Sequence, residues 1–229
     1  MLTGRLFFNM QKKLTVVAIS DTHCRHRSLR LPKGDILIHA GDLCNKGEKS
    51  EVLDFLHWFE KQNFEHKIFI AGNHDFFFER EKQSAIEKLL PPGIIYLNDN
   101  GVTIEGINFW GTPVTPWFFN WAFNKRRGAE ISRHWDMIPD NTDVLICHGP
   151  AYGILDSVVN GAHVGCKDLL KKVIALKPNL VIHGHVHESF GTLKYNGIKF
   201  LNASQLNESY ELVNKPLVSE YEVGKVFSS

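Results

Sequence analysis

The chain has 229 residues, 43% of them hydrophobic, and its 26 lysines and arginines nearly balance its 25 aspartates and glutamates. This length suits one large domain with a sizeable core. The charge balance excludes the overall positive field that gathers nucleic acid or anionic membranes, so we expect a small or locally recognised partner.

The start of the chain has only a short apolar piece, LFF, far short of a signal-peptide core or the ~20 apolar residues of a membrane span. We interpret residues 1–11 as a tail and residues 12–229 as a single domain that does not enter a membrane. Four cysteines are scattered without any CxxC pair, which favours a reducing cytoplasm. They are Cys24, Cys44, Cys147 and Cys166.

Three short apolar runs, at 13–20, 35–40 and 66–72, are rich in β-branched residues and typical of strands buried on both faces of a sheet. Between the second and third runs, apolar residues recur at helical spacing over 52–59. Strands and helices therefore alternate as in crossover units. A second helix is predicted over 79–90, where Pro91 and Pro92 end it.

The segment 101–112 predicts two short antiparallel strands. The alternation then resumes with a strand at 143–149, a helix at 166–177 that Pro178 ends, and a strand at 179–185. A hairpin about Asn196-Gly197 and a last strand at 216–223 follow. The predicted fold class is α/β (α+β), a two-layer β sandwich flanked by helices.

Each buried strand leads into a loop that carries metal-competent side chains, and such loops are where α/β sheets place ligand sites. The loops contain Asp21, His23, Asp42, Asn73, His74, Asp75, His148, and the HGHVH stretch at 183–187. A single aspartate there is usually a turn former, and a single histidine usually makes one hydrogen bond at a half-buried position. Histidine has no privileged place in turns, so five such strand ends together favour a metal site.

The blocks DTH, GD, GNHD, HG and GHVH, in this order, resemble the five-block signature of calcineurin-like metallophosphoesterases and span residues 21–187. The longer segments HGPAYGILD, GAHVGCKDLL, INFWGTPVTPWFFNWAF and NASQLNESYELVNKPLV are similar to the MPPED-type phosphodiesterase branch. The resemblance implies a metallophosphoesterase-like fold and a site with two metal ions.

The family's ligand positions all have counterparts in this chain. The resemblance implies that Asp21, His23, Asp42 and His187 hold the first ion, and that Asp42, as a bridge, holds the second with Asn73, His148 and His185. His183 precedes the GHVH block and is assigned to the end of its strand. Mixed histidine, aspartate and asparagine ligands suit divalent transition metals, manganese first among iron, zinc and nickel, better than calcium. Two such ions clamp a phosphate while a hydroxide between them attacks phosphorus in line.

His74 resembles the family's histidine that is not a ligand but reaches the scissile phosphate. It would stabilise developing charge and protonate the leaving group. Asp75, the next residue, either orients that imidazole or starts a helix.

Three stretches are candidates for substrate contacts. Arg25 and His26, after the first block, could contact phosphate, although the alternative for the arginine is a solvated basic loop. His163 lies in a long loop after His148, and long loops are often functional.

The stretch TPWFFNWAF, at 115–123, has five aromatic residues within nine positions. Aromatic rings can stack on a nucleobase, and both Trp117 and Trp121 are open to this role, with Trp117 taken as the substrate contact. The alternative is that the phenylalanines, Phe118, Phe119 and Phe123, cover the second sheet.

We expect a binuclear-metal phosphodiesterase for small phosphodiesters, with 2′,3′- or 3′,5′-cyclic nucleotides as the first candidates. The alternatives are a phosphomonoesterase or a nuclease with the same metal core, or a weakly catalytic scaffold that binds partners. The lack of a long basic stripe argues against a nucleic-acid polymer. The complete ligand set argues against a scaffold. The sequence leaves the oligomeric state open.

Overall fold

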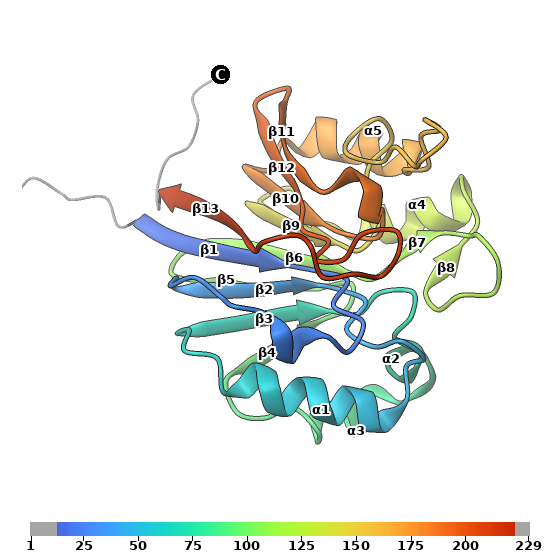
Figure 1. Ribbon diagram of the computed structural model, residues 1–229. Coiled ribbons are helices and arrows are strands. Elements are labelled where there is room, and N and C mark those ends of the chain that lie inside the picture. Colours follow the sequence, from blue (N-terminus) through green and yellow to red (C-terminus); the bar gives the residue numbers. More distant parts are fainter. Residues whose placement is uncertain (1–12, 223–229) are drawn as a thin grey trace, which may run out of the picture.

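The computed structural model describes residues 13–222, so the predicted tail at 1–11 lies outside the described residues. Two β sheets lie face to face, and helices cover the outer face of each (Figure 1). The predicted two-layer β sandwich flanked by helices is therefore confirmed.

The first sheet has the strand order β13-β1-β2-β3-β4. Its members are β1 (Lys13–Ile19), β2 (Ile36–Ala40), β3 (His66–Ile70), β4 (Ile94–Leu97) and β13 (Leu217–Glu222). Strands β1 to β4 are parallel, and β13 pairs antiparallel with β1. The register sets Ile19 beside His39 and His39 beside Phe69, so the carboxyl ends of β1, β2 and β3 lie at one edge.

The second sheet has the order β11-β12-β10-β9-β6-β5. Its members are β5 (Asn100–Ile104), β6 (Ile107–Thr112), β9 (Val144–Cys147), β10 (Leu180–His183), β11 (Gly191–Tyr195) and β12 (Ile198–Asn202). The four central strands are parallel, and β5 and β11 are antiparallel edges. Positive φ angles at Asn196 and Gly197 form the hairpin turn that the sequence predicts.

Alternate residues of each buried strand face two different cores. Val16 and Ala18 of β1 pack between the sheets, whereas Val17 and Ile19 pack toward helix α1 (Lys49–Glu60). The outer face of the second sheet packs in the same way against α4 (Ala129–Asp136) and α5 (Lys167–Leu176). Burial on both faces explains why these strands are continuous apolar runs.

The predicted helix over 79–90 is wrong in its extent. The segment forms two short helices, α2 (Phe76–Arg80) and α3 (Gln83–Glu87), because Glu81 and Lys82 between them are extended. The break lets Phe77, Phe78 and Ile86 all pack into the core beside the first sheet. Tertiary packing of this kind outweighs helix propensity in short segments.

Several elements had no counterpart among the predicted ones. They are β4, α4, the short parallel pair β7 (Thr115–Pro116) and β8 (Asn124–Lys125), and the 3-10 turns η1 (His26–Ser28) and η2 (His187–Ser189). Within residues 13–222, none of the helices is both long enough and apolar enough to cross a membrane.

Candidate metal centre

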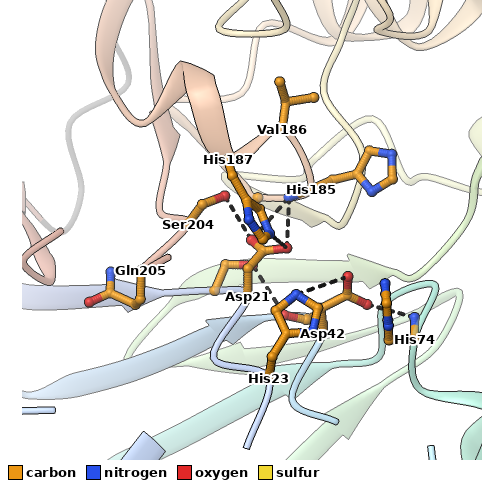
Figure 2. Close-up of polar contacts among 12 residues, drawn as sticks. Asp21, His23, Asp42, His74, His185, Val186, His187, Ser204 and Gln205 are labelled. Atoms are coloured by element: carbon orange, nitrogen blue, oxygen red, sulfur yellow. Dashed lines mark hydrogen bonds and ion pairs between the residues drawn. The ribbon is translucent and has the colours of Figure 1, made fainter. Parts of the chain in front are cut away.

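The predicted ligands come together where the parallel strands of both sheets end. Asp21, Asp42 and Asn73 follow β1, β2 and β3 of the first sheet, while His148 follows β9 of the second. His185 and His187 follow β10 (Figure 2). The two sheets therefore contribute side chains to the same space from opposite sides.

One group of potential ligand atoms lies around Asp21. Asp21, His23 and His187 each offer one atom within 4.8 Å of the others. His187 Nε2 lies 3.5 Å from Asp21 Oδ1. Asp21 is fully buried, and a buried carboxylate needs such cationic or hydrogen-bonding partners.

A second group lies around Asp42, with His148 and His185 within the same 4.8 Å limit. His148 Nε2 is 3.3 Å from Asp42 Oδ2 and 2.9 Å from Asn73 Oδ1, which brings the asparagine into this group. Asp42 Oδ2 also lies 3.8 Å from His23 Nε2. Asp42 thus stands between the two groups.

Three of the histidines are oriented by main-chain carbonyls. The Nδ1–H groups of His23, His148 and His187 donate to the carbonyl oxygens of Cys44, Ala40 and Asn207, at 3.1, 2.9 and 3.0 Å. This fixes the tautomer and leaves Nε2 toward the carboxylates. His23 Nε2 is buried and has no hydrogen-bond partner among the described residues, which is the state expected of an atom that ligates a metal.

Hydrogen bonds from residues around the centre orient the two carboxylates. Asp21 accepts hydrogen bonds from the His185 backbone N–H at 3.0 Å and from Ser204 Oγ at 2.8 Å, and Asp42 Oδ1 accepts one from the His74 backbone N–H at 2.8 Å (Figure 2). Ser204 was not predicted, because a serine after a strand has no metal-site pattern of its own.

Two glycines of the sequence blocks are required by close approach. A Cβ at Gly184 would lie 2.0 Å from Asp21 Oδ2, and a Cβ at Gly72 would lie 2.3 Å from Asp42 Oδ1. Any larger residue at either position would displace a carboxylate of the centre.

Backbone strain occurs at several of the same residues. Four of the seven predicted ligands have positive φ angles, namely Asp21 (52°), His23 (39°), Asp42 (56°) and His185 (71°). L-residues seldom adopt this region, and such strain persists where the surrounding structure enforces it, often at functional sites.

The ionisation of the centre is dominated by burial and by the carboxylates. Burial would raise the pKa of Asp21, but the hydrogen bond and charge of His187 hold that pKa well below its usual value. For His187 itself, burial lowers the pKa, yet the Asp21 carboxylate outweighs burial and raises it to about 9. Burial and the charge of His148 lower the pKa of His185 to about 3. The two carboxylates thus attract positive charge, which protons or metal cations can supply.

His74 lies at the side of the centre and is half-buried. Its Nδ1–H donates to the Asn45 carbonyl at 2.8 Å, which leaves Nε2 as the free ring nitrogen. The ring lies 4.7 Å from the His23 ring and 4.2 Å from the Trp121 ring, measured between centroids.

Asp75 stands at the N-cap position of α2, as the helix-start alternative predicts, although its side chain makes no cap hydrogen bond there. The His74 imidazole is oriented by the Asn45 carbonyl. The buried carboxylate of Asp75 accepts backbone N–H groups of Gly72 at 2.7 Å and Cys44 at 2.9 Å. Asp75 therefore ties together the loops that follow β2 and β3.

The predicted phosphate contacts differ in their surroundings. His26 is fully buried, its Nε2 lies 3.0 Å from Asp54, and its ring packs against Phe55 and Trp58. It therefore has no surface to offer a phosphate, and we assign it to the core beside α1. Arg25 is exposed.

His163 is also accessible, with its side chain 47% exposed. Its Nδ1 lies 2.6 Å from the buried Asp156 carboxylate, which also accepts the backbone N–H groups of Gly153 and Gly165.

The alternative prediction for the aromatic stretch, that its phenylalanines cover the second sheet, is wrong for two of the three residues. Phe123 is buried, but Phe118 and Phe119 are 42% and 72% exposed, so these two do not cover the second sheet. Trp117 is exposed, and it is Trp121 whose ring lies against His74. Tyr210, which was not predicted, places its ring 4.9 Å from His23.

Comparisons with known proteins identify the family and the fold. Residues 14–189 match the calcineurin-like phosphoesterase family. Metallophosphoesterase domain-containing protein 1 of Homo sapiens is 39% identical over 225 residues, which cover 88% of this chain and 69% of that protein. The UPF0046 protein K07C11.7 of Caenorhabditis elegans is 36% identical over 217 residues, which cover 90% of this chain and 74% of that protein. Among solved structures, the phosphopantetheinyl hydrolase of Mycobacterium tuberculosis has a similar fold, with a TM-score of 0.57 at 16% identity over 83% of this chain and 88% of that one.

Proposed function

The chain belongs to the calcineurin-like phosphoesterase family, whose members use divalent metals, and on this premise we propose that it is a phosphodiesterase for small phosphodiesters with two metal ions. The observation that carries the proposal is the position of Asp42, whose Oδ2 lies 3.8 Å from His23 Nε2 on one side and 3.3 Å from His148 Nε2 on the other. A carboxylate between two groups of nitrogen donors is suited to bridge two cations.

The donor set fits such ions. We assign Asp21, His23, Asp42 and His187 to one ion and Asp42, Asn73, His148 and His185 to the other. Imidazole nitrogens with carboxylate and amide oxygens match manganese, iron, zinc and nickel, and we propose manganese as the first to test. When bound, two such ions polarise a phosphoester and make water a better nucleophile near neutral pH.

We assign the proton chemistry at the leaving group to His74. Its Nδ1–H is committed to the Asn45 carbonyl, so Nε2 is the atom that would hold a proton for the departing oxygen or donate to the phosphate. The Trp121 ring and the His23 ring limit how far the imidazole can turn.

The proposed substrate is a small phosphodiester, with 2′,3′- and 3′,5′-cyclic nucleotides the first to test. Arg25 and His163 are proposed as contacts to the substrate because both are exposed. The near-neutral charge of the chain, with 26 basic and 25 acidic residues, argues for a small substrate over a polymer. Four free cysteines support a reducing, cytoplasmic location.

The experiment is a comparison of kcat/KM for a cyclic nucleotide, a linear diester and a monoester, with protein that has been stripped of metal and refilled with manganese. We expect turnover of diesters that depends on the metal and exceeds that of the monoester. A higher kcat/KM for the monoester would replace the proposal with a phosphomonoesterase. If none of the three substrates is hydrolysed, an enzymatic role is contradicted.

A further inference from the structure

A pocket of about 420 Å³ opens beside the candidate metal centre. The segment between β7 and β8 supplies most of its wall, and the remainder comes from the loop that follows β3, the first residue of α2 and the loop that follows β12. The lining residues are His74, Phe76, Phe118, Phe119, Asn120, Trp121 and Tyr210.

Three aromatic rings connect this pocket to the metal centre. The Trp121 ring lies 4.2 Å from the His74 ring, the Tyr210 ring lies 5.3 Å from the His187 ring, and the Phe118 ring lies 5.8 Å from the His185 ring. A phosphate held at the centre would therefore have an aromatic wall at its side.

Hydrogen bonds fix the wall to the segment that carries His74. The Ala122 N–H donates to the Asn73 carbonyl at 3.1 Å, and the Phe123 N–H donates to Glu79 Oε1 at 2.7 Å. Within the loop, Asn124 Nδ2 donates to the Phe118 carbonyl at 2.8 Å. A wall fixed before binding loses little conformational freedom when a ligand enters.

The lining specifies the chemistry of a ligand. None of the described lining residues is an aspartate, glutamate, lysine or arginine, and most of them are flat rings. Such a surface stacks well on a planar apolar group and offers no partner for an additional charge. Phe118 and Phe119 remain 42% and 72% exposed, so apolar surface is available for a ligand to cover.

We propose that this pocket binds an uncharged planar group esterified to the scissile phosphate, and that it selects substrates by that group. The proposal rests on the phosphodiesterase function proposed above and adds a specificity site to it. Trp121 is the principal contact, because its ring lies closest to His74.

The test compares two diesters whose leaving alcohols are both primary and similar in acidity: methyl 2-naphthylmethyl phosphate and dimethyl phosphate. We expect kcat/KM of the manganese-loaded protein to favour the naphthylmethyl ester by roughly 10-fold or more, which is the range of aromatic stacking. A carboxylate added to the far ring should cancel most of the preference. Equal values for the two diesters would overturn the proposal.

Variants locate the preference. Trp121→Leu should bring the ratio of the two kcat/KM values close to one. Any effect of that change on His74 cancels in the ratio, because both substrates use the same imidazole. Phe119→Ala, at a position 72% exposed and therefore safe for folding, should lower the ratio as well. Trp117→Leu is the matched control, since Trp117 is exposed but does not line the pocket, and it should leave the ratio unchanged. A ratio that falls only in Trp117→Leu would overturn the assignment.

Measurements of ligand affinity distinguish a failure of the pocket assignment from a failure of the proposed phosphodiesterase function. Calorimetry of the manganese-loaded protein should show tighter binding of 2-naphthylmethyl phosphate than of methyl phosphate, by a factor that Trp121→Leu removes. If that factor is present but no diester is hydrolysed, the pocket assignment holds and the phosphodiesterase function fails. If diesters are hydrolysed but the two phosphates bind equally, the pocket assignment fails alone.

Discussion

The candidate metal centre and the aromatic pocket are neighbours but are positioned by different parts of the fold. Asp21, Asp42 and His148 follow buried parallel strands directly and are themselves buried. Phe118 and Phe119 lie on an exposed loop that a few hydrogen bonds hold. Changes in the first region should therefore affect every substrate, whereas changes at the exposed phenylalanines of the second should alter the choice among substrates.

The largest effect is expected for Asp42→Asn. The change keeps the shape but removes the charge between His23 and His148, so each of the two proposed ions would lose the charge of a shared ligand. We expect kcat for every phosphodiester to fall by more than the ~100-fold upper range seen when an outer-shell partner is lost. Steady-state kinetics with excess manganese measures this.

The matched control is Asp143→Asn. Asp143 accepts the Asn108 backbone N–H at 2.8 Å at the other end of β9, away from the centre. Its kinetics should resemble those of the unchanged protein, and equal losses in the two variants would show that the effect of Asp42 is one of folding.

His74→Ala should have the next largest effect. A general acid or charge stabiliser contributes about 10²- to 10⁴-fold, so turnover of an alkyl diester should fall within this range while the metal content is kept. An aryl diester, whose leaving group needs little protonation, should lose less.

Equal losses for both esters would instead assign His74 to charge stabilisation. His134→Ala is the control. His134 lies on α4 with its Nδ1 2.7 Å from Asp99, and His134 takes no part in the centre. Loss of metal in His74→Ala would contradict its assignment as a residue that is not a ligand.

Ser204→Ala should have a smaller effect, on metal affinity. It removes the hydroxyl that donates to Asp21 Oδ2 at 2.8 Å, and loss of such a partner typically weakens metal binding ~10- to 100-fold. Competition with a chelator gives the affinity. Ser219→Ala on β13, where the hydroxyl accepts from Lys199 Nζ, is the control and should leave the affinity unchanged.

The smallest effect is expected for Arg25→Ala. An exposed charge contributes about 0.2–1 kcal/mol, so KM for a phosphodiester should rise by at most ~5-fold, and less at high salt. Arg30→Ala, also exposed, should leave KM unchanged. A large fall in kcat in Arg25→Ala would place this residue nearer the reacting phosphate than we propose.

The sequence was informative where local pattern and three-dimensional position coincide. Strands buried on both faces are continuous apolar runs, and a ligand directly after such a strand has its place set by the sheet. His26 shows the limit, because its burial depends on Asp54 and Trp58 of α1, which are distant in sequence. An isolated histidine near a ligand gives no local sign of which way it points.

The same limit applies to the surroundings of the centre. Ser204 and Tyr210 come from the segment after β12 and have residue types common in any loop. Trp121, rather than Trp117, lies on His74 because the loop is held at Ala122 by the Asn73 carbonyl, a contact between distant segments. The exposure of Phe118 and Phe119 likewise follows from the path of the loop and not from their apolar character.

The central claim is that this chain binds two metal ions and that Asp42 is shared between them. Elemental analysis after metal removal, refilling with manganese and desalting tests it most directly. We expect two manganese ions per chain in the unchanged protein, and a loss affecting both ions in Asp42→Asn. Trace metal in the unchanged protein, or two ions retained in Asp42→Asn, would contradict the account.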